Sequence, residues 1–274
     1  MPEIELAQGT IRYRDEGSGP PIVFVHGALV DGRLWEQVVE RLGPARCVVP
    51  DLPLGAHRIA LRPDADVSPP GLARMIAELI ERLDLRDVTL VGNDTGGALC
   101  QFVVTGHPER IGRLVLTNCD AFDNFPPAMF RPLGTLARAR LLTAALQPLR
   151  LRALRRLPIA FGWLTRRRLP DELLDAWVEP FLSDAGVRRD ARRFLLAIDR
   201  DALLDNTARL HDFDRPVLLA WAPEDRFFPL EHARRLAAIF PDARLVEVPD
   251  AYAFVSLDQP ERLAHLIREH VPWS

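Results

Sequence analysis

Short apolar runs alternate with amphipathic helical segments over the first 120 residues, and this alternation limits the fold more than any other feature. The run PIVFVHG at 21–27 is apolar and ends in glycine, as expected of a strand buried on both faces. Segments 34–43 and 68–85 carry apolar residues at helical spacing. The rhythm predicts a mostly parallel sheet with helices on both faces. The predicted strands are residues 3–7, 10–16, 21–27, 47–50, 88–92 and 113–118.

The same rhythm returns near the end of the chain, with predicted strands at 216–222 and 244–248. The intervening residues 124–209 show no strand pattern; they are rich in leucine, alanine and arginine and are interrupted by prolines. We therefore expect a helical cap at 124–209, inserted into an α/β core made of residues 1–123 and 210–274.

Composition excludes several functions. With 274 residues, 48% of them apolar, the chain can bury a full core, and a net charge of −3 argues against nucleic-acid binding. No apolar run approaches the roughly 18–20 residues of a membrane span, and the acidic N-terminus does not resemble a signal peptide. Three cysteines without a C-x-x-C pair favour a cytoplasmic protein. A homodimer is left open. All 35 basic residues are arginine, which excludes lysine-based covalent catalysis.

The segment LVGNDTGGALC at 90–100 places Asp94 between glycines where a buried strand turns into a helix. This pattern is typical of a nucleophile elbow, because the tight turn leaves no room for side chains beside the nucleophile. An aspartate there can attack an sp³ carbon and form an ester, and the helix N-terminus favours its negative charge. The alternative is that Asp94 only caps the helix.

Five motifs follow one another in a familiar order: HGALVDGRLW, VVPDLPLG, VGNDTGG, HPERIGRLVL and WAPEDRFFP. Over its whole length the chain resembles the α/β-hydrolase superfamily, specifically its aspartate-nucleophile branch of haloalkane dehalogenases and epoxide hydrolases. The resemblance implies that the Ala28 and Thr95 amides form an oxyanion hole and that Asp225 is the triad carboxylate. Asp120 and Asp123 are alternatives for that carboxylate. We expect no cofactor and no metal ion.

The catalytic histidine of this superfamily has no counterpart here. Its turn, typically glycine-histidine-phenylalanine, reads Tyr252-Ala253-Phe254 in this chain, so alanine stands at the position of the base. General-base catalysis contributes about 10²–10⁴-fold to such reactions. His57 is the best substitute among the remaining histidines, with a surface or packing role as the alternative, whereas His26 is expected to be structural.

The resemblance does not identify the substrate. Thr95 stands where dehalogenases place a halide-binding tryptophan and where fluoroacetate dehalogenases place an arginine, and the predicted cap lacks the tyrosines of epoxide hydrolases. Aromatic residues of the cap predict a pocket for a small, mainly apolar substrate; they are Phe125, Phe130, Phe161, Trp163 and Trp177. Three functions stay open: a hydrolase with an atypical or missing base, a lyase or isomerase using Asp94 as acid or base, and a ligand-binding protein without turnover.

Overall fold

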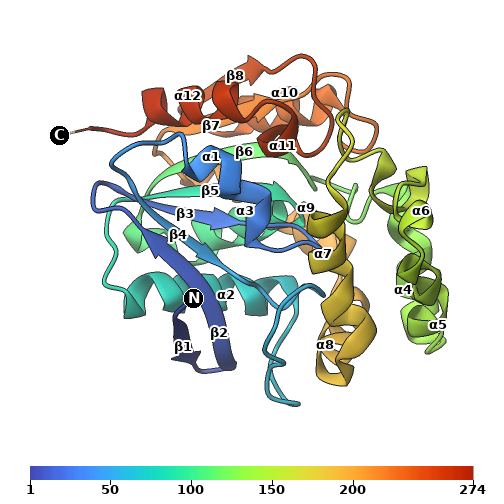
Figure 1. Cartoon of the computed structure of the whole chain (residues 1–274). Helices are drawn as coiled ribbons and strands as arrows, with labels where there is room; N and C mark the ends of the chain where they lie inside the picture. Colours follow the sequence, from blue (N-terminus) through green and yellow to red (C-terminus); the bar gives the residue numbers. More distant parts are fainter. Residues whose placement is uncertain (274) are drawn as a thin grey trace.

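An eight-stranded sheet crosses the computed structural model, which describes residues 1–273 (Figure 1). The strand order is β1-β2-β4-β3-β5-β6-β7-β8; β1 and β2 run antiparallel to their neighbours and all other pairs are parallel. The predicted mostly parallel sheet is therefore confirmed. The strands are β1 Glu3–Leu6, β2 Gly9–Glu16, β3 Pro21–Val25, β4 Arg46–Pro50, β5 Val88–Asp94, β6 Ile111–Cys119, β7 Val217–Trp221 and β8 Ala243–Glu247.

Helices cover both faces of the sheet. On one face α2 packs against α3, and α9 packs on α3; on the other, α12 contacts α1 and α11 (Figure 1). The predicted helix at 34–43 is shorter in the structure, because its first turn is the 3-10 helix η1, whose amide at Arg33 is capped by Asp31. The bounds are η1 Gly32–Trp35, α1 Glu36–Val39, α2 Pro69–Arg82, α3 Thr95–Gly106, η2 Pro108–Arg110, α9 Arg200–Thr207, α10 Leu230–Ile239, α11 Val255–Asp258 and α12 Pro260–His270.

The chain between β6 and α9 consists of short helices stacked beyond one end of the sheet (Figure 1). An isolated bridge between Ala121 and Asn124 is the nearest approach to a strand in this part of residues 1–273. The division into core and cap stays a prediction. The elements are η3 Ala128–Phe130, α4 Arg131–Arg138, α5 Leu142–Leu146, η4 Gln147–Arg150, α6 Arg152–Arg155, η5 Pro158–Gly162, α7 Asp171–Ser183 and α8 Ala185–Ala197, with η6 Leu210–Asp212 after α9.

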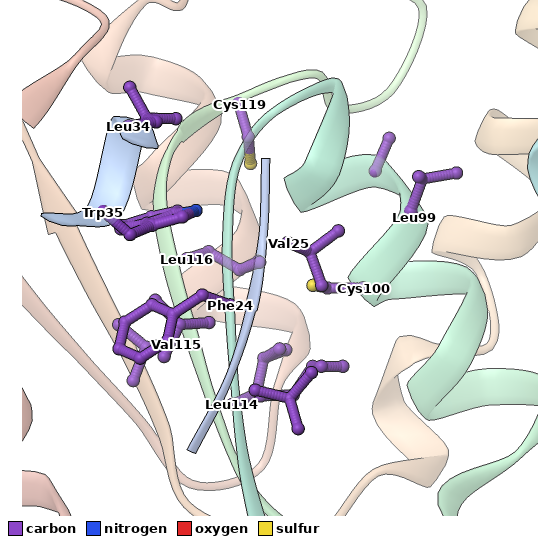
Figure 2. Close-up of a cluster of buried hydrophobic side chains, with 14 of the residues drawn as sticks. Phe24, Val25, Leu34, Trp35, Leu99, Cys100, Leu114, Val115, Leu116 and Cys119 are labelled. Atoms are coloured by element: carbon purple, nitrogen blue, oxygen red, sulfur yellow. The ribbon is translucent and has the colours of Figure 1, made fainter. Parts of the chain in front are cut away.

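Buried apolar side chains cluster around the central strands (Figure 2). Phe24 of β3 packs on Trp35 of η1 with ring centroids 5.2 Å apart, and both side chains are fully buried. Each such side chain contributes about 1.5–3 kcal/mol through burial. This packing holds β3, β5 and β6 rigidly beneath the turn at Asp94. No helix among the described residues has the length and apolarity that crossing a membrane requires.

Close packing explains the glycines that surround the turn between β5 and α3. A Cβ built on Gly96 would lie 2.3 Å from the carbonyl oxygen of Val25, and one on Gly92 would lie 2.7 Å from Cys100 Sγ. Real Cβ atoms do not make contacts this short. The first turn of α3 therefore sits directly on the backbone of β3, and only glycine permits this approach.

We predict that Gly96→Ala lowers the free energy of unfolding by about 1–3 kcal/mol or more, because the backbone must move apart to admit the methyl group. Gly106→Ala is the matched control: it lies in the same helix, and no atom lies within 4 Å of the position that its Cβ would take, so its stability should stay equal or rise by up to about 1 kcal/mol. Denaturant unfolding of both variants measures the difference. Equal midpoints for the Gly96 variant and the parent protein would contradict the packing argument.

Candidate active site

Asp94 occupies a strained position at the end of β5. Its φ of 55° and ψ of −133° are outside the regions that L-residues normally adopt, and such strain costs about 1–3 kcal/mol per residue. The carboxylate turns back on the helix start, where Oδ1 accepts the amide of Thr95 at 2.6 Å. The sequence prediction of a sharp strand–helix turn with a central aspartate matches this geometry.

The backbone of Gly27 lies against the second oxygen of the same carboxylate. A Cβ at Gly27 would be 2.6 Å from Asp94 Oδ2, so a larger residue would collide with the carboxylate. The next amide, that of Ala28, donates no hydrogen bond within residues 1–273. Asp94 thus has one oxygen on the Thr95 amide and the other beside the backbone of Gly27.

Burial controls the charge of Asp94. It raises the pKa of this half-buried carboxyl to about 7, while hydrogen bonds from the Thr95 amide and hydroxyl act in the opposite direction. A carboxyl that titrates near neutrality exists as both acid and carboxylate at pH 7. It can serve as a nucleophile when ionised or as an acid or base.

Asp225 follows β7 and is held in place by hydrogen bonds. Its oxygens accept from Asn118 Nδ2 at 2.7 Å and from the Phe227 amide at 2.9 Å. Asn118, at the end of β6, also forms two hydrogen bonds with the backbone of Ala222. Burial raises the pKa of Asp225 to about 7, and these hydrogen bonds partly oppose the rise. Asn118 was not anticipated from the sequence, although it ends a predicted strand.

Ala253 is fully buried, and its carbonyl oxygen is hydrogen-bonded to the residue before Asp94. Asn93, the residue before Asp94, donates from Nδ2 to the Ala253 carbonyl at 2.7 Å and to the Asn118 carbonyl at 3.0 Å. The turn at residues 252–254 therefore lies next to the ends of β5 and β6. Asn93 was also not anticipated, because a single amide within a glycine-rich turn gives no signal of a partner 160 residues away.

A second buried group joins this turn to the helical segment between β6 and α9. Asp258, in α11, accepts the amides of Tyr252 at 3.0 Å, Arg166 at 2.9 Å and Arg167 at 3.1 Å. The Phe254 amide donates to the carbonyl of Leu164 at 2.9 Å. Hydrogen bonds from the amides of Arg166, Arg167 and Phe254 thus fix the Ala253 turn and α11 against residues 164–167.

An aromatic and cationic stack lies on the outer side of the same turn. The Arg226 guanidinium is 4.7 Å from the ring centroid of Trp163 and 5.1 Å from that of Tyr252. Its Nη2 also donates to the Tyr252 hydroxyl at 3.2 Å. The Tyr252 side chain therefore packs against the guanidinium of Arg226.

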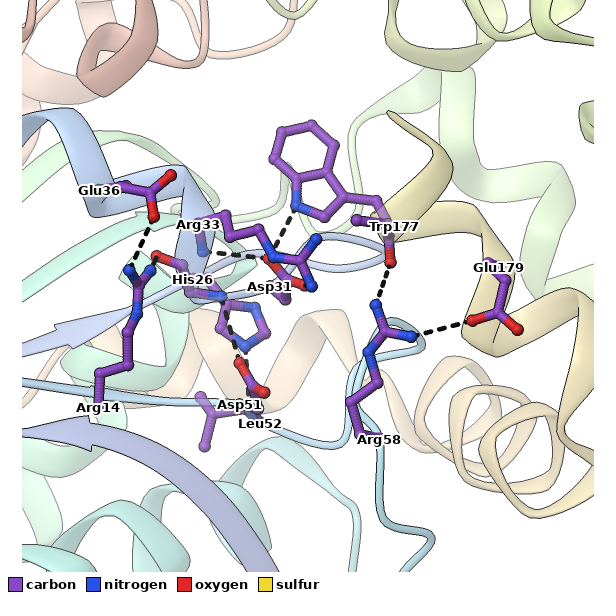
Figure 3. A network of polar contacts seen from close by, with 12 residues as sticks. Arg14, His26, Asp31, Arg33, Glu36, Asp51, Leu52, Arg58, Trp177 and Glu179 are labelled. Carbon is purple, nitrogen blue, oxygen red and sulfur yellow. Dashed lines mark hydrogen bonds and ion pairs between the residues drawn. The ribbon is translucent and has the colours of Figure 1, made fainter. Parts of the chain in front are cut away.

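Both nitrogens of His26 and of His57 are engaged elsewhere. His26 bonds the Gly27 carbonyl through Nδ1 at 2.8 Å and accepts the Leu52 amide at Nε2 at 2.9 Å (Figure 3). His57 accepts the Gly55 amide at 3.3 Å and lies 3.4 Å from Asp190 Oδ2 in α8. Within residues 1–273 no histidine is hydrogen-bonded to Asp94 or Asp225.

The two alternative carboxylates lie in different environments. Asp123 is exposed and pairs with Arg200 at 3.6 Å. Asp120 is fully buried, with Oδ2 at 3.2 Å from the hydroxyl of Thr95. Burial, followed by the charge of Asp94, raises the pKa of Asp120 well above its ordinary range. The Asp120 carboxyl is thus hydrogen-bonded to Thr95, the residue after Asp94, and not to Asp225.

Most of the predicted pocket aromatics pack with one another or with the core. Trp177 donates from Nε1 to the buried Asp31 at 3.0 Å (Figure 3) and lies with its ring centroid 5.7 Å from that of Phe161. Leu29, adjacent to Ala28, joins these rings in lining an apolar cavity of about 10 Å³. No group of three or more His, Cys, Asp or Glu side chains within residues 1–273 is arranged to bind a metal ion.

A family model described as the alpha/beta hydrolase fold matches residues 20–260. The chain belongs to this alpha/beta hydrolase family. It is 29% identical to haloalkane dehalogenase 2 of Mycobacterium tuberculosis, over 97% of this chain and 92% of the relative. It is 26% identical to 2-hydroxy-6-oxo-6-phenylhexa-2,4-dienoate hydrolase of Burkholderia cepacia, over 89% and 85% of the two chains.

Solved structures share the fold of this alpha/beta hydrolase. An alpha/beta hydrolase fold protein from Burkholderia ambifaria superposes with a TM-score of 0.82 at 24% identity, covering 97% of this chain and 96% of that one. An esterase from Thermogutta terrifontis superposes with a TM-score of 0.77 at 22% identity, covering 99% and 100%. The protein is therefore an alpha/beta-hydrolase-fold enzyme related to haloalkane dehalogenases.

We predict that Asp94→Asn stabilises the protein at alkaline pH. Folding raises the pKa of Asp94 from 3.8 to about 7, so the folded protein binds a proton at Asp94 more tightly than the unfolded chain does. The stability that this protonated carboxyl contributes is fully present below pH 4 and is lost as the pH rises through 7. The asparagine variant lacks this loss, so its free energy of unfolding at pH 8 should exceed that of the parent by on the order of 1–2 kcal/mol, with little difference at pH 4.

Asp175→Asn is the matched control for this measurement. Asp175 pairs with Arg155 and Arg152 near the surface, and these arginines lower its pKa. Its replacement should give no gain at pH 8. Equal pH profiles of stability for the Asp94 variant and the parent would show that Asp94 is not desolvated by folding.

Proposed function

We propose that this enzyme attacks carbon atoms of small, mainly apolar substrates with the carboxylate of Asp94, and forms an alkyl–enzyme ester. The observation that carries the proposal is the strained backbone at Asp94, which aims a carboxylate at the start of α3 between the Thr95 amide and Gly27. A residue that only capped α3 would not need this conformation, because N-cap residues normally have extended backbones.

The two oxygens of Asp94 have different roles in this proposal. Oδ1 accepts the Thr95 amide at 2.6 Å and becomes the ester carbonyl. Oδ2 has no hydrogen-bond donor within residues 1–273 and is the attacking atom. Oδ2 forms the new bond to the substrate carbon while the bond from that carbon to its leaving group breaks. The leaving group departs with the electron pair of that bond.

The Thr95 and Ala28 amides form the oxyanion hole for the later hydrolysis of this ester. Attack of water on the ester carbonyl carbon moves negative charge onto Oδ1, which already accepts a hydrogen bond from the Thr95 amide. The Ala28 amide, free among the described residues, supplies the second donor. Alkylation thus needs only groups that are present in this chain.

Release of the product lacks its usual base, because Ala253 occupies the histidine position. Asp225 keeps the hydrogen bonds of a triad carboxylate, from Asn118 and the Phe227 amide, but no imidazole stands between it and a water molecule. Without general-base catalysis hydrolysis slows by about 10²–10⁴-fold. The alkyl–enzyme should therefore accumulate.

The pKa of Asp94 supports a second candidate function. A carboxyl that titrates near pH 7 in a half-buried site is suited to take or give a proton. A lyase or isomerase would use Asp94 in this way without forming an ester. A covalent adduct distinguishes the nucleophile from the acid–base group.

We expect incubation with a short alkyl bromide or an epoxide to give a stable mass increase of one modification in the intact protein, because attack by the Asp94 carboxylate on either carbon forms an alkyl ester. Asp94→Asn is the control, because the amide retains the shape of the carboxylate and loses its nucleophilicity. Intact-mass spectrometry of both proteins measures the adduct. An equal mass increase in the control, or none in the parent, would exclude Asp94 as the nucleophile.

The double variant Tyr252→Gly, Ala253→His should convert the adduct into slow turnover. The Asn93 bond to position 253 uses the backbone carbonyl, so it survives the substitution, and glycine restores the open turn of the superfamily. Released product, measured by chromatography, should increase by at least about tenfold over the parent. A parent that already turns over many equivalents would show that another residue acts as the base.

A further inference from the structure

The carboxyl of Asp120 is a buried acid that the proposed reaction does not use. It follows β6 directly, is fully buried, and has one oxygen, Oδ1, without a hydrogen-bond partner among residues 1–273. The Thr95 hydroxyl and the charge of Asp94 are the groups that act on this carboxyl, and no arginine or histidine within residues 1–273 forms an ion pair with it. An ionised carboxylate in this setting is strongly disfavoured, because no positively charged side chain offsets the loss of hydration.

The Thr95 hydroxyl connects this acid to Asp94. Its Oγ1 lies 3.2 Å from Asp120 Oδ2 and 3.4 Å from Asp94 Oδ1. A hydroxyl has one proton and can donate to only one of these oxygens. The other contact is a hydrogen bond only if its carboxyl carries a proton and donates to Thr95.

The surroundings decide which carboxyl holds that proton. Asp94 is half-buried, and its Oδ1 already accepts the Thr95 amide at 2.6 Å. Asp120 receives no such amide on its carboxyl, since within residues 1–273 its side chain is hydrogen-bonded only to the Thr95 hydroxyl. The negative charge is therefore more stable on the carboxylate of Asp94, and the proton is more stable on the carboxyl of Asp120.

We propose that Asp120 is a protonated positioning residue, which donates to Thr95 Oγ1 so that the hydroxyl in turn donates to Asp94 Oδ1. The inference rests on the proposed function of Asp94. It explains how Oδ1 is held by two donors from one residue while Oδ2 stays available for attack. The pair of acids then carries a single negative charge, which lies on Asp94.

The other titratable groups around Asp120 do not supply a counter-charge. Cys119 of β6 and Cys100 of α3 are buried thiols whose pKa values burial raises well above their ordinary value, so both are neutral at pH 7. Gln101 of α3 donates to the Asp120 carbonyl at 2.9 Å and not to its carboxyl. Asp225, which follows β7, is a further acid and supplies no positive charge.

Infrared spectroscopy tests the proton directly. In the full-length protein labelled with ¹³C-carboxyl aspartate, we expect the carbonyl stretch of a protonated carboxylic acid to persist at pH 8.5. This band should vanish in Asp120→Asn and remain in Asp94→Asn. Its absence from the parent at pH 8.5, or its persistence in Asp120→Asn, would overturn the proposal. This readout does not depend on any reaction of Asp94.

Alkylation rates test the positioning role. Asparagine at 120 can donate an N–H to Thr95, so Asp120→Asn should alkylate within about twofold of the parent, whereas Asp120→Leu cannot donate and should fall roughly tenfold. Circular dichroism shows whether the leucine variant folds. If it does not, Thr95→Val replaces it, with the same expected fall. Equal alkylation rates in the parent and in a folded variant that cannot donate to Thr95 would overturn the positioning role. If the parent shows the infrared band but forms no adduct, the proposed function of Asp94 is wrong and the protonation of Asp120 still stands.

Discussion

The reversal of the chain at Asp94 is the constraint on which the rest of the site depends. A side chain with φ of 55° is held there only because the surrounding structure leaves no alternative. Gly96 packs against the carbonyl of Val25 in β3, and Gly97 packs against Cys119 in β6. The first turn of α3, which follows β5 directly, is therefore in contact with β3 and β6 as well. The core beneath them, centred on Phe24 and Trp35, keeps these strands in register.

Buried amides and carboxylates extend this rigidity from the turn to the rest of the site. Asn93 links the elbow to Ala253, Asn118 links β6 to Asp225, and Asp258 links the turn at 252–254 to the stretch at 164–167. Each is a side chain that satisfies backbone groups which would otherwise be buried without partners. These bonds do not depend on the side chain at position 253, because Asn93 binds the backbone carbonyl of Ala253.

Local patterns allowed the strands, the helices and the elbow to be predicted from the sequence. Apolar runs such as 21–27 and the glycines around Asp94 act within a few residues, so their physical cause is visible in a short stretch. The contacts of Asn93 with Ala253 and of Asp258 with Arg166 were not predictable, because they join residues about 90–160 positions apart and depend on how the turns meet in space. Asp120 was anticipated as an alternative triad acid, and that role stays a prediction; its contact with the Thr95 hydroxyl was not anticipated.

The central claim is that Asp94 attacks the substrate carbon, and locating the attached group tests it most directly. After reaction with an alkyl bromide, trypsin cleaves at Arg86 and Arg110 and releases residues 87–110, which contain both Asp94 and Cys100. Tandem mass spectrometry then assigns the modified residue, and mild alkali separates esters, which hydrolyse, from thioethers, which do not. The account predicts an alkyl group on Asp94 that alkali removes; an alkali-stable group on Cys100, or an ester on Asp120, would contradict it.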